Sequence, residues 1–231
     1  RGIGKGHALQ LAKAGASVVV NDVDADVAEA VVQEIKAIGG NAIANTDSVA
    51  ERAGADAIVG SCVDAFGKID IMMANAGIVR DRTFLKMTED DFDAVINVHV
   101  KGTFLCHQAA ALTMKAQGTG GVLLSTVSAA HFGNFGQTNY AGAKGAIASM
   151  TYTLAMELAR YGIRVNAISP SGTTRMSDTY IGPDGKKHDL PYIDPELNGT
   201  VLVYLCSDEG NYVSGQVFGT GGARIALLSQ P

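Results

Sequence analysis

Short apolar runs that alternate with longer stretches of helical periodicity constrain the fold of this chain more than any other feature. Apolar runs without polar interruptions are typical of parallel strands covered on both faces, and the stretches between them have the length of crossover helices. We therefore predict an α/β fold, a Rossmann-type doubly wound parallel sheet with helices on both faces. The predicted strands are residues 17–20, 41–44, 69–74, 121–125, 164–168 and 216–218, and the predicted helices are residues 5–15, 24–39, 49–66, 89–117, 137–161 and 195–207.

The size and composition favour a single domain over residues 1–231. The chain is long enough for one large hydrophobic core and too short for two domains of ordinary size. Hydrophobic residues make up 47% of it and charged residues 18%, a balance typical of globular rather than disordered proteins. We find no linker, internal repeat or low-complexity tract that would divide it.

The net charge and the cysteines narrow the classes of partner. A formal charge of −5 offers no basic surface for nucleic acid or anionic lipid, so we expect neither nucleic acid nor membrane as a partner. Cys62, Cys106 and Cys206 stand singly without metal-ligand spacing, and we interpret them as reduced core residues. With no apolar run near the length of a membrane span, these features favour a cytoplasmic protein that binds a small molecule and no metal.

The first residues, Arg1 to Gly4, have the pattern of the second half of a glycine-rich turn, which in doubly wound folds follows a strand. No such strand precedes them in the sequence. A sheet without this central strand would leave the hydrophobic edges of its two neighbours exposed. We therefore predict that further residues, including that strand, precede Arg1 in the natural protein.

Two features predict a dinucleotide site. The turn Gly2-Ile3-Gly4 precedes a predicted helix, whose free N–H groups and dipole favour a bound pyrophosphate. On its own, this glycine pair is equally typical of an ordinary turn. Asp22 strengthens the prediction, because it ends an apolar strand eighteen residues after Gly4, where a carboxylate holds the ribose hydroxyls of such a cofactor.

Asp22 also favours NAD over NADP, because its negative charge would repel a 2′-phosphate. Arg1, in the glycine-rich turn, favours the opposite choice, since a cation there could bind that phosphate. We give Asp22 more weight and predict NAD. Asp22 could instead cap the next helix, although Asp24 competes for that position.

Tyr140 and Lys144 lie four residues apart within a predicted helix, so they project from one face, one turn apart. A tyrosine hydroxyl with an ordinary pKa of about 10 is a poor general acid at neutral pH, and a neighbouring ammonium group would lower that pKa. The pair therefore predicts an acid–base site for the oxygen of a ketone or alcohol. The same spacing also arises by chance, so its surroundings decide the interpretation.

Polar residues follow several predicted strands at the edge where open α/β sheets bind ligands. The segment 125–128, Ser-Thr-Val-Ser, ends one strand with hydroxyls that could bond a substrate oxygen, although such hydroxyls also satisfy backbone groups. Asn75-Ala76-Gly77 ends a second strand and Pro170 a third. The polar segment 173–195 is long enough for a loop that closes over a substrate.

Together these residues resemble the motifs of the short-chain dehydrogenase/reductase family in order and spacing, from Arg1 to about Ala223. Arg1 to Gly4 resembles the end of its glycine-rich cofactor motif, residues 74–77 its Asn-Asn-Ala-Gly motif, and Tyr140 to Lys144 its catalytic Tyr-x-x-x-Lys. Pro170 matches its proline after a strand. Within the family, the chain is most similar to hydroxyacyl-CoA dehydrogenase domains of multifunctional β-oxidation enzymes and to related actinobacterial reductases. The stretches that carry this narrower similarity are residues 21–22, 98–100, 133–140 and 174–176.

The resemblance implies roles for residues that spacing alone does not assign. Asn75 and Ala76 are expected to line the cofactor cleft, beside Gly77. Asp47 is expected to face the adenine. Thr174 is expected to hold the carboxamide of the nicotinamide. These roles rest on the family and not on the residues themselves.

The chain departs from the family's pattern at two positions. The catalytic serine of the family stands thirteen residues before the tyrosine, which is Val127 here, whereas Ser128 stands twelve before it. A loop one residue shorter would return Ser128 to the site, so we predict Ser128, with Thr126 or Ser125 as alternatives. His99 replaces the family's helical asparagine, and an imidazole there could relay a proton or simply pack in the core.

We therefore expect an enzyme that transfers a hydride between NAD(H) and a secondary alcohol or ketone, such as a 3-hydroxyacyl thioester or an alicyclic or steroid alcohol. Two alternatives stay open: a dinucleotide-binding sensor or assembly subunit without catalysis, and an NADPH-dependent oxoacyl reductase. The resemblance also implies a homotetramer built on the predicted helices 89–117 and 137–161. The identity of the substrate and the direction of the reaction do not follow from the sequence.

Overall fold

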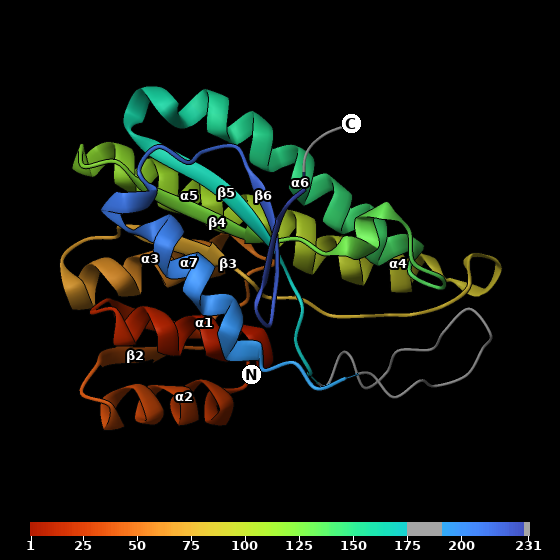
Figure 1. Ribbon diagram of the computed structural model, residues 1–231, viewed down its shortest axis with the longest axis horizontal. Coiled ribbons are helices and arrows are strands. Elements are labelled where there is room, and N and C mark those ends of the chain that lie inside the picture. Colours follow the sequence, from red (N-terminus) through yellow and green to blue (C-terminus); the bar gives the residue numbers. More distant parts are fainter. Residues whose placement is uncertain (175–190, 229–231) are drawn as a thin grey trace.

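Strands and helices alternate along the chain in the computed structural model, which describes residues 1–174 and 191–228 (Figure 1). Each predicted segment forms the predicted type of element, with ends shifted by a few residues. The helices are α1 (Gly2–Lys13), α2 (Ala25–Ala37), α3 (Arg52–Phe66), α4 (Glu89–Ile96), α5 (Gly102–Gln117), α6 (Thr138–Leu158) and α7 (Gly199–Cys206). The strands are β1 (Ser17–Asn21), β2 (Asn41–Asn45), β3 (Ile71–Ala74), β4 (Gly121–Thr126), β5 (Ile163–Pro170), β6 (Val217–Gly221) and β7 (Arg224–Leu227).

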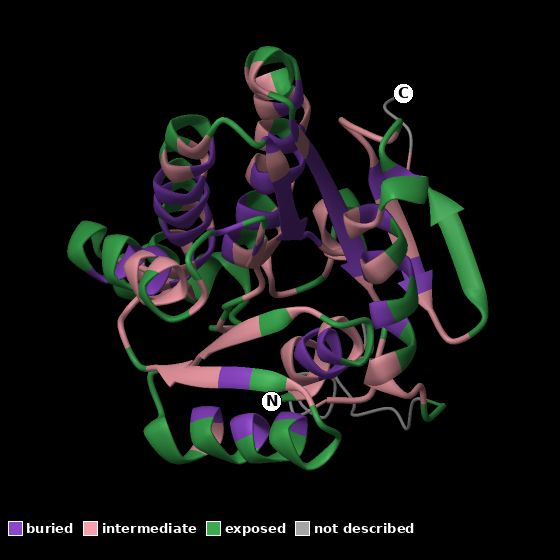
Figure 2. Ribbon diagram, turned by 90° about the vertical axis from the view of Figure 1, so that its left-hand side faces the viewer, coloured by how far each residue is buried: buried purple, intermediate pink, exposed green. Residues whose placement is uncertain are grey.

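The helices form two layers, one on each face of the strands. Helices α3, α5 and α6 pack on one face, where α5 contacts β3 and α6 contacts β5. Helices α1 and α7 pack together on the other face, and α2 covers β2. Strands β4 and β5 lie between the layers and are buried along most of their length (Figure 2). The prediction of a doubly wound α/β fold is confirmed.

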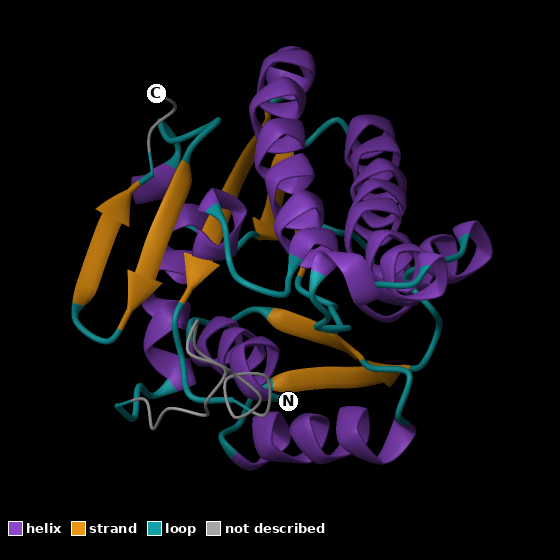
Figure 3. Ribbon diagram, turned by 90° about the vertical axis from the view of Figure 1, so that its right-hand side faces the viewer, coloured by secondary structure: helices purple, strands orange, loops and turns teal. Residues whose placement is uncertain are grey.

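The described strands form two separate sheets (Figure 3). β1 and β2 pair in parallel, and the second sheet has the order β3-β4-β5-β6-β7, parallel from β3 to β6. A cavity of about 1490 Å³ extends between the sheets, with residues 18–20 of β1 and residues 71–73 of β3 in its lining. Within the described residues, β1 and β3 form no ladder with each other. The strand predicted ahead of Arg1 stays a prediction.

Strand β7 lies outside the prediction. It pairs antiparallel with β6 at the end of the sheet, and all its residues are exposed. Residues 225–228, Ile-Ala-Leu-Leu, form a short apolar run that the prediction did not include. Within the strand, this run is exposed at the edge of the sheet and is not part of the buried core.

The predicted helix 89–117 is interrupted by a turn of π-helix, Asn97–Lys101, between α4 and α5. Such turns inside α-helices are frequent at functional sites. The helix begins at Glu89, as predicted, and Thr88 caps it: the Thr88 hydroxyl accepts the backbone N–H of Asp91, and the Asp91 carboxylate accepts the backbone N–H of Thr88. The π-turn changes the directions in which the residues of α4 and α5 face relative to one another. His99 lies at the centre of this turn.

The predicted substrate loop, 173–195, lies partly outside the described residues, which omit 175–190. The two ends of this segment are held together. The N–H of Thr173 donates to the carbonyl oxygen of Ile193 (2.8 Å), and the N–H of Ile193 donates to the Thr173 hydroxyl (2.9 Å). Among the described helices, none combines the length and apolar character needed to cross a lipid bilayer.

Candidate active site

The carboxyl ends of β3, β4 and β5 meet the glycine-rich turn of α1 around the large cavity. Parallel strands place their carboxyl ends at one edge of a sheet, and this brings together residues that are far apart in the sequence. The lining includes every predicted site residue except Asp47, namely Arg1, Gly2, Ile3, Gly4, Asp22, Asn75, Ala76, Gly77, His99, Ser128, Tyr140, Lys144, Pro170 and Thr174.

Lys144 reaches the centre of the site from α6. Its side chain is buried, and its Nζ donates a 2.6 Å hydrogen bond to the carbonyl oxygen of Thr126 at the end of β4. The same Nζ lies 5.5 Å from the centroid of the Tyr140 ring. Burial lowers the pKa of Lys144 to about 7, because the ammonium group loses its hydration. The amine can therefore exchange a proton near neutral pH.

Tyr140 lies one turn before Lys144, as predicted, but its pKa shifts in the direction opposite to the expected one. Burial raises the pKa of Tyr140, a hydrogen bond with Ser128 opposes that rise, and the negative charge of Asp81 adds to it. The expected lowering by Lys144 does not appear. Since the pKa of Lys144 is itself about 7, the amine is mostly neutral at the pH where a tyrosine ordinarily ionises.

Side-chain directions after β4 decide which hydroxyl faces Tyr140. Val127 is buried in a hydrophobic cluster, so the next side chain, that of Ser128, points to the opposite side. The Ser128 hydroxyl hydrogen-bonds with Tyr140 and also accepts the backbone N–H two residues later (3.2 Å). Thr126, one of the alternatives, donates its hydroxyl to the side chain of Asn75 instead (3.1 Å). The geometry favours Ser128.

His99 packs edge-on against the Tyr140 ring, with the ring centroids 5.3 Å apart and the planes at 89°. It is buried, and its Nε2 lies 2.8 Å from the carbonyl oxygen and 3.0 Å from the nitrogen of Ile78, so either tautomer finds a partner there. Its Nδ1 has no partner among the described residues. Burial, with a smaller effect from Lys144, lowers the pKa of His99 to about 3, and the ring is therefore neutral at physiological pH. A Cβ on Gly77 would overlap this imidazole, which explains the glycine.

The glycine-rich turn leaves room for a ligand at the start of α1. The helix begins at Gly2, whose φ of +52° is a conformation that side chains rarely adopt. A Cβ on Gly4 would come within 2.6 Å of Nδ2 of Asn75, and one on Gly2 within 3.0 Å of Cγ2 of Thr174. These small residues and the free N–H groups of the first helical turn fit the pyrophosphate of a dinucleotide.

Arg1 and Asp22, which favour opposite cofactors, form an ion pair. Nη2 of Arg1 lies 3.1 Å from Oδ1 of Asp22, and Nη1 lies 3.5 Å from Oδ2 of Asp24. Asp22 also accepts the backbone N–H of Asp24 (3.1 Å). Two carboxylates thus surround one guanidinium group, so the net charge of this cluster is negative.

Asp47 does not line the cavity. Its carboxylate accepts a hydrogen bond from Nδ2 of Asn45 (2.8 Å), and its carbonyl oxygen accepts one from Nδ2 of Asn21 (2.9 Å). These bonds join the carboxyl ends of β1 and β2 next to Asp22. Ser48 lines the cavity in its place. The role of Asp47 toward adenine therefore stays a prediction.

Polar residues that the sequence did not indicate also line the cavity, among them Asp81, Asn134 and Gln137. Nε2 of Gln137 donates to both carboxylate oxygens of Asp81, at 3.1 Å each. Fifty-six positions separate these partners, and no local pattern in the sequence links them. The sequence contained only an indirect signal that these residues belong to the site. Asp81 follows the predicted strand end at Gly77, and Gln137 precedes Tyr140 by three residues.

Comparison with known proteins shows what the whole chain is similar to. A family profile described as enoyl-(acyl carrier protein) reductase matches residues 1–222. A short-chain type dehydrogenase/reductase of Mycobacterium tuberculosis is 40% identical over 98% of this chain and 82% of its own length. The peroxisomal hydratase-dehydrogenase-epimerase of Neurospora crassa is 39% identical over 98% of this chain, which is 26% of that protein. The crystal structure of a short chain dehydrogenase from Mycobacterium avium matches with a TM-score of 0.88 and 38% identity, over 99% of this chain and 82% of that one.

Proposed function

Because the chain belongs to the short-chain dehydrogenase/reductase family, we propose that it is an oxidoreductase that transfers a hydride between NAD(H) and a secondary alcohol or ketone. One observation carries this proposal: Ser128, Tyr140 and Lys144 meet in the cavity that also contains the glycine-rich turn. When a carbonyl carbon gains a hydride, its oxygen must gain a proton. A proton-exchanging group beside a dinucleotide cleft meets that requirement.

The nicotinamide dinucleotide supplies or accepts the hydride, and the chain supplies the site that orients it. The glycine cradle at the start of α1 fits the pyrophosphate, and Asp22 is placed to bind the adenosine ribose. The negative charge of the Asp22, Asp24 and Arg1 cluster supports NAD over NADP, because a 2′-phosphate would be repelled. The residues that we assign to cofactor binding are Arg1, Gly2, Ile3, Gly4, Asp22, Asp47, Asn75, Ala76, Gly77, Tyr140, Lys144, Pro170 and Thr174.

Tyr140 exchanges the proton with the substrate oxygen, giving it in reduction and taking it in oxidation. Ser128, which bonds the Tyr140 hydroxyl, positions that oxygen. Lys144 bonds the nicotinamide ribose and, when protonated, stabilises the phenolate form of Tyr140. His99 has a free Nδ1 among the described residues and is neutral, so it is suited to accept a hydrogen bond from a water and to hold that water near Tyr140 and Lys144.

A 3-hydroxyacyl thioester is the substrate class that we favour, with alicyclic or steroid alcohols as alternatives. The N. crassa relative combines a hydratase with a dehydrogenase in its name. A hydratase forms an alcohol by adding water to a double bond, and a dehydrogenase then oxidises that alcohol. The 3-oxoacyl-[acyl-carrier-protein] reductase of Thermotoga maritima, 35% identical over 97% of this chain, supports the second candidate, an NADPH-dependent oxoacyl reductase. A sensor or assembly subunit would bind the cofactor without turnover.

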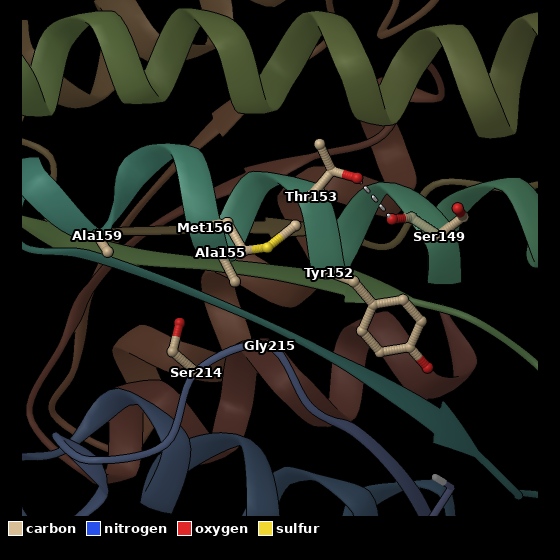
Figure 4. Close-up of a pocket in the computed structure, with 8 residues that line it drawn as sticks. All are labelled: Ser149, Tyr152, Thr153, Ala155, Met156, Ala159, Ser214 and Gly215. Carbon is tan, nitrogen blue, oxygen red and sulfur yellow. Dashed lines mark hydrogen bonds between the residues drawn. The ribbon is translucent and has the colours of Figure 1, made fainter. Parts of the chain in front are cut away.

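The assembly that we propose is a homotetramer built on α5 and α6. Phe104 and Leu112 on α5 and Met156 on α6 expose large apolar side chains, which self-association would cover. Figure 4 shows Met156 beside a cavity of about 560 Å³ between α6 and residues 214–215. Sedimentation at micromolar concentration tests this, and a monomer would contradict it. We also propose that the protein works in the cytoplasm.

Titration with NADH and NADPH, followed by a panel of ketones, tests the proposed function. We expect tighter binding of NADH than of NADPH, and turnover that is present in the wild type and lost in Tyr140→Phe. The nicotinamide absorbance reports the turnover. Binding without turnover on any ketone or alcohol would favour the sensor, tighter binding of NADPH would favour the oxoacyl reductase, and absence of binding would contradict all three.

A further inference from the structure

Asp81 brings a negative charge to the reacting end of the cavity. It follows β3, four residues after Gly77, and lines the cavity with Gln137 and Tyr140. Gln137 donates Nε2 to both of its carboxylate oxygens, at 3.1 Å each. The carboxylate is close enough to Tyr140 for its charge to raise the pKa of the phenol.

Hydrogen bonds fix the backbone on both sides of Asp81. The N–H of Arg82 donates to the carbonyl oxygen of Gly136 (2.8 Å). The carbonyl oxygen of Arg80 accepts from Nδ2 of Asn139, which is fully buried next to Tyr140 (3.1 Å). The segment that carries Asp81 is therefore tied directly to the segment that leads into α6, and the carboxylate keeps its place relative to the acid–base pair.

The carboxylate of Asp81 is exposed at the cavity, and water can leave its acceptor positions for a ligand. An ionised carboxylate accepts about four hydrogen bonds, and within the described part of the chain one amide nitrogen, Nε2 of Gln137, donates to it. That amide is held in turn by Asn134, whose Nδ2 donates to Oε1 of Gln137 (2.8 Å). Among the described residues, no cation pairs with Asp81, because the neighbouring Arg82 pairs with Asp91 (3.1 Å).

We infer that Asp81, held by Gln137, determines substrate specificity: it binds a neutral hydrogen-bond donor beside the reacting carbon and excludes a carboxylate there. The inference rests on the proposed function, in which Tyr140 faces the reacting oxygen. An amide or hydroxyl of the substrate fills the open acceptor positions of Asp81. A free carboxylate at the same place meets an uncompensated like charge. The substrate is thus a neutral acyl derivative with a hydrogen-bond donor near the reacting carbon, rather than a free keto acid. In a thioester of the pantetheine type, this donor is the amide N–H of the arm that follows the sulfur.

Three titratable groups surround Tyr140, and they come from different elements. Lys144 lies on α6, His99 on the π-turn, and Asp81 on the segment after β3. His99, with a pKa of about 3, is neutral near pH 7, and Lys144, with a pKa of about 7, is partly cationic. Asp81 is the anion of the three. Its removal lowers the pKa of Tyr140.

Acetoacetate and acetoacetamide share a ketone and differ only in the neighbouring group, which is a carboxylate in the first and an amide in the second. Comparing their binding therefore tests directly whether the site prefers the neutral group to the anion. We would measure the binding of each by calorimetry to wild type, Asp81→Asn and Asp90→Asn saturated with NAD⁺, which cannot reduce a ketone, so that the heat reports binding alone. Asp90 is an exposed carboxylate at the start of α4, outside the cavity lining. We expect the wild type and Asp90→Asn to bind the amide about tenfold more tightly than the acid, and Asp81→Asn to lose this preference. An unchanged preference in Asp81→Asn, or none in the wild type, would overturn the inference.

A second measurement needs neither turnover nor cofactor. Ultraviolet absorbance of tyrosinate, with a Tyr140→Phe variant as the reference, follows the ionisation of Tyr140 in each protein. We expect a lower pKa of Tyr140 in Asp81→Asn and an unchanged one in Asp90→Asn, and equal values would overturn the placement of Asp81. If no ketone is reduced while the binding and titration results hold, the proposed reaction fails and the role of Asp81 stands.

Discussion

The two ends of the cavity hold their charge-bearing residues in different ways. At the reacting end, Lys144 and His99 are buried and hydrogen-bonded to backbone groups. At the ribose end, water reaches the ion pairs that Arg1 forms with Asp22 and Asp24. Both ends carry charge-bearing residues that lie far apart in the sequence. Loss of hydration dominates at the first end and is the largest cause of the pKa shifts of its residues. At the ribose end, the direct pairing of opposite charges in a water-accessible environment dominates.

The difference sets how strongly each end should respond to substitution. A shift of one pKa unit corresponds to about 1.4 kcal/mol. The pKa of Lys144 falls by several units, so its free-energy equivalent is several times that value. An exposed ion pair contributes about 1 kcal/mol or less, because water and salt screen it. Substitutions at the reacting end should therefore change chemistry and stability, and those at the ribose end only the choice of cofactor.

The largest effect is expected for Tyr140→Phe. The variant keeps the ring that packs against His99 but loses the hydroxyl that exchanges the proton. We expect kcat to fall about 10²- to 10⁴-fold, the usual contribution of a general acid or base. The affinity for NADH should change much less, because the ribose end is untouched. Stopped-flow binding and steady-state turnover separate the two, and a retained kcat would remove Tyr140 from the mechanism.

Lys144 should make the stability depend on pH. Its pKa falls from 10.5 to about 7 in the folded protein, so between these values the unfolded chain binds more protons than the folded one. The free energy of unfolding should therefore rise from pH 7 to pH 10, by up to about 1.4 kcal/mol per pH unit. Lys144→Met should remove this rise, and the exposed control Lys36→Met should keep it. Urea denaturation at several pH values measures the slope, and equal slopes in all three proteins would show that Lys144 is not desolvated.

Gly77→Ala tests the packing at the reacting end. The new methyl group would overlap the imidazole of His99, which is held by its bonds to Ile78 and cannot retreat freely. We expect a loss of about 1–3 kcal/mol in the free energy of unfolding. Gly60→Ala is the matched control, because a Cβ there meets nothing within 4 Å inside α3 and should add about 0.5–1 kcal/mol. Thermal unfolding compares the two, and a neutral Gly77→Ala would mean that this packing is loose.

The smallest effect is expected for Asp22→Asn at the ribose end. Removing one of the two carboxylates leaves Arg1 and Asp24 balanced, so the repulsion of a 2′-phosphate weakens. We expect the preference for NADH over NADPH to fall about tenfold, which corresponds to about 1.4 kcal/mol, and stability to stay within about 1 kcal/mol. Asp26→Asn, on the exposed first turn of α2, is the control. An unchanged preference would place the discrimination elsewhere.

Much of the fold was predictable because its signals are local. The six apolar runs became β1 to β6, since buried parallel strands need continuous apolar sequence, while β7, whose apolar residues are exposed at the sheet edge, was missed. The π-turn at Asn97–Lys101 was also missed, because helical periodicity continues across it. Neither miss changes the arrangement of the layers.

For the site, the sequence by itself determined the pair Tyr140 and Lys144, because a spacing of four on a helix needs no tertiary information. It also identified the strand ends and Gly2 to Gly4, whose chemistry follows from short segments. It predicted Ser128 but left Thr126 and Ser125 open, and only the burial of Val127 after β4 resolved which side chain faces Tyr140.

The tertiary structure alone decided the contacts and the electrostatics. Asp81 and Gln137 meet across 56 positions, and Arg1 meets Asp22 across 21, so no window of sequence contains both partners of either pair. The raised pKa of Tyr140 likewise results mainly from burial by the surrounding elements. This burial outweighs the lowering of the pKa that the spacing of Tyr140 and Lys144 predicts. Spacing along a chain determines which groups share a face, but desolvation depends on everything that packs around them, and that exists only in the folded protein.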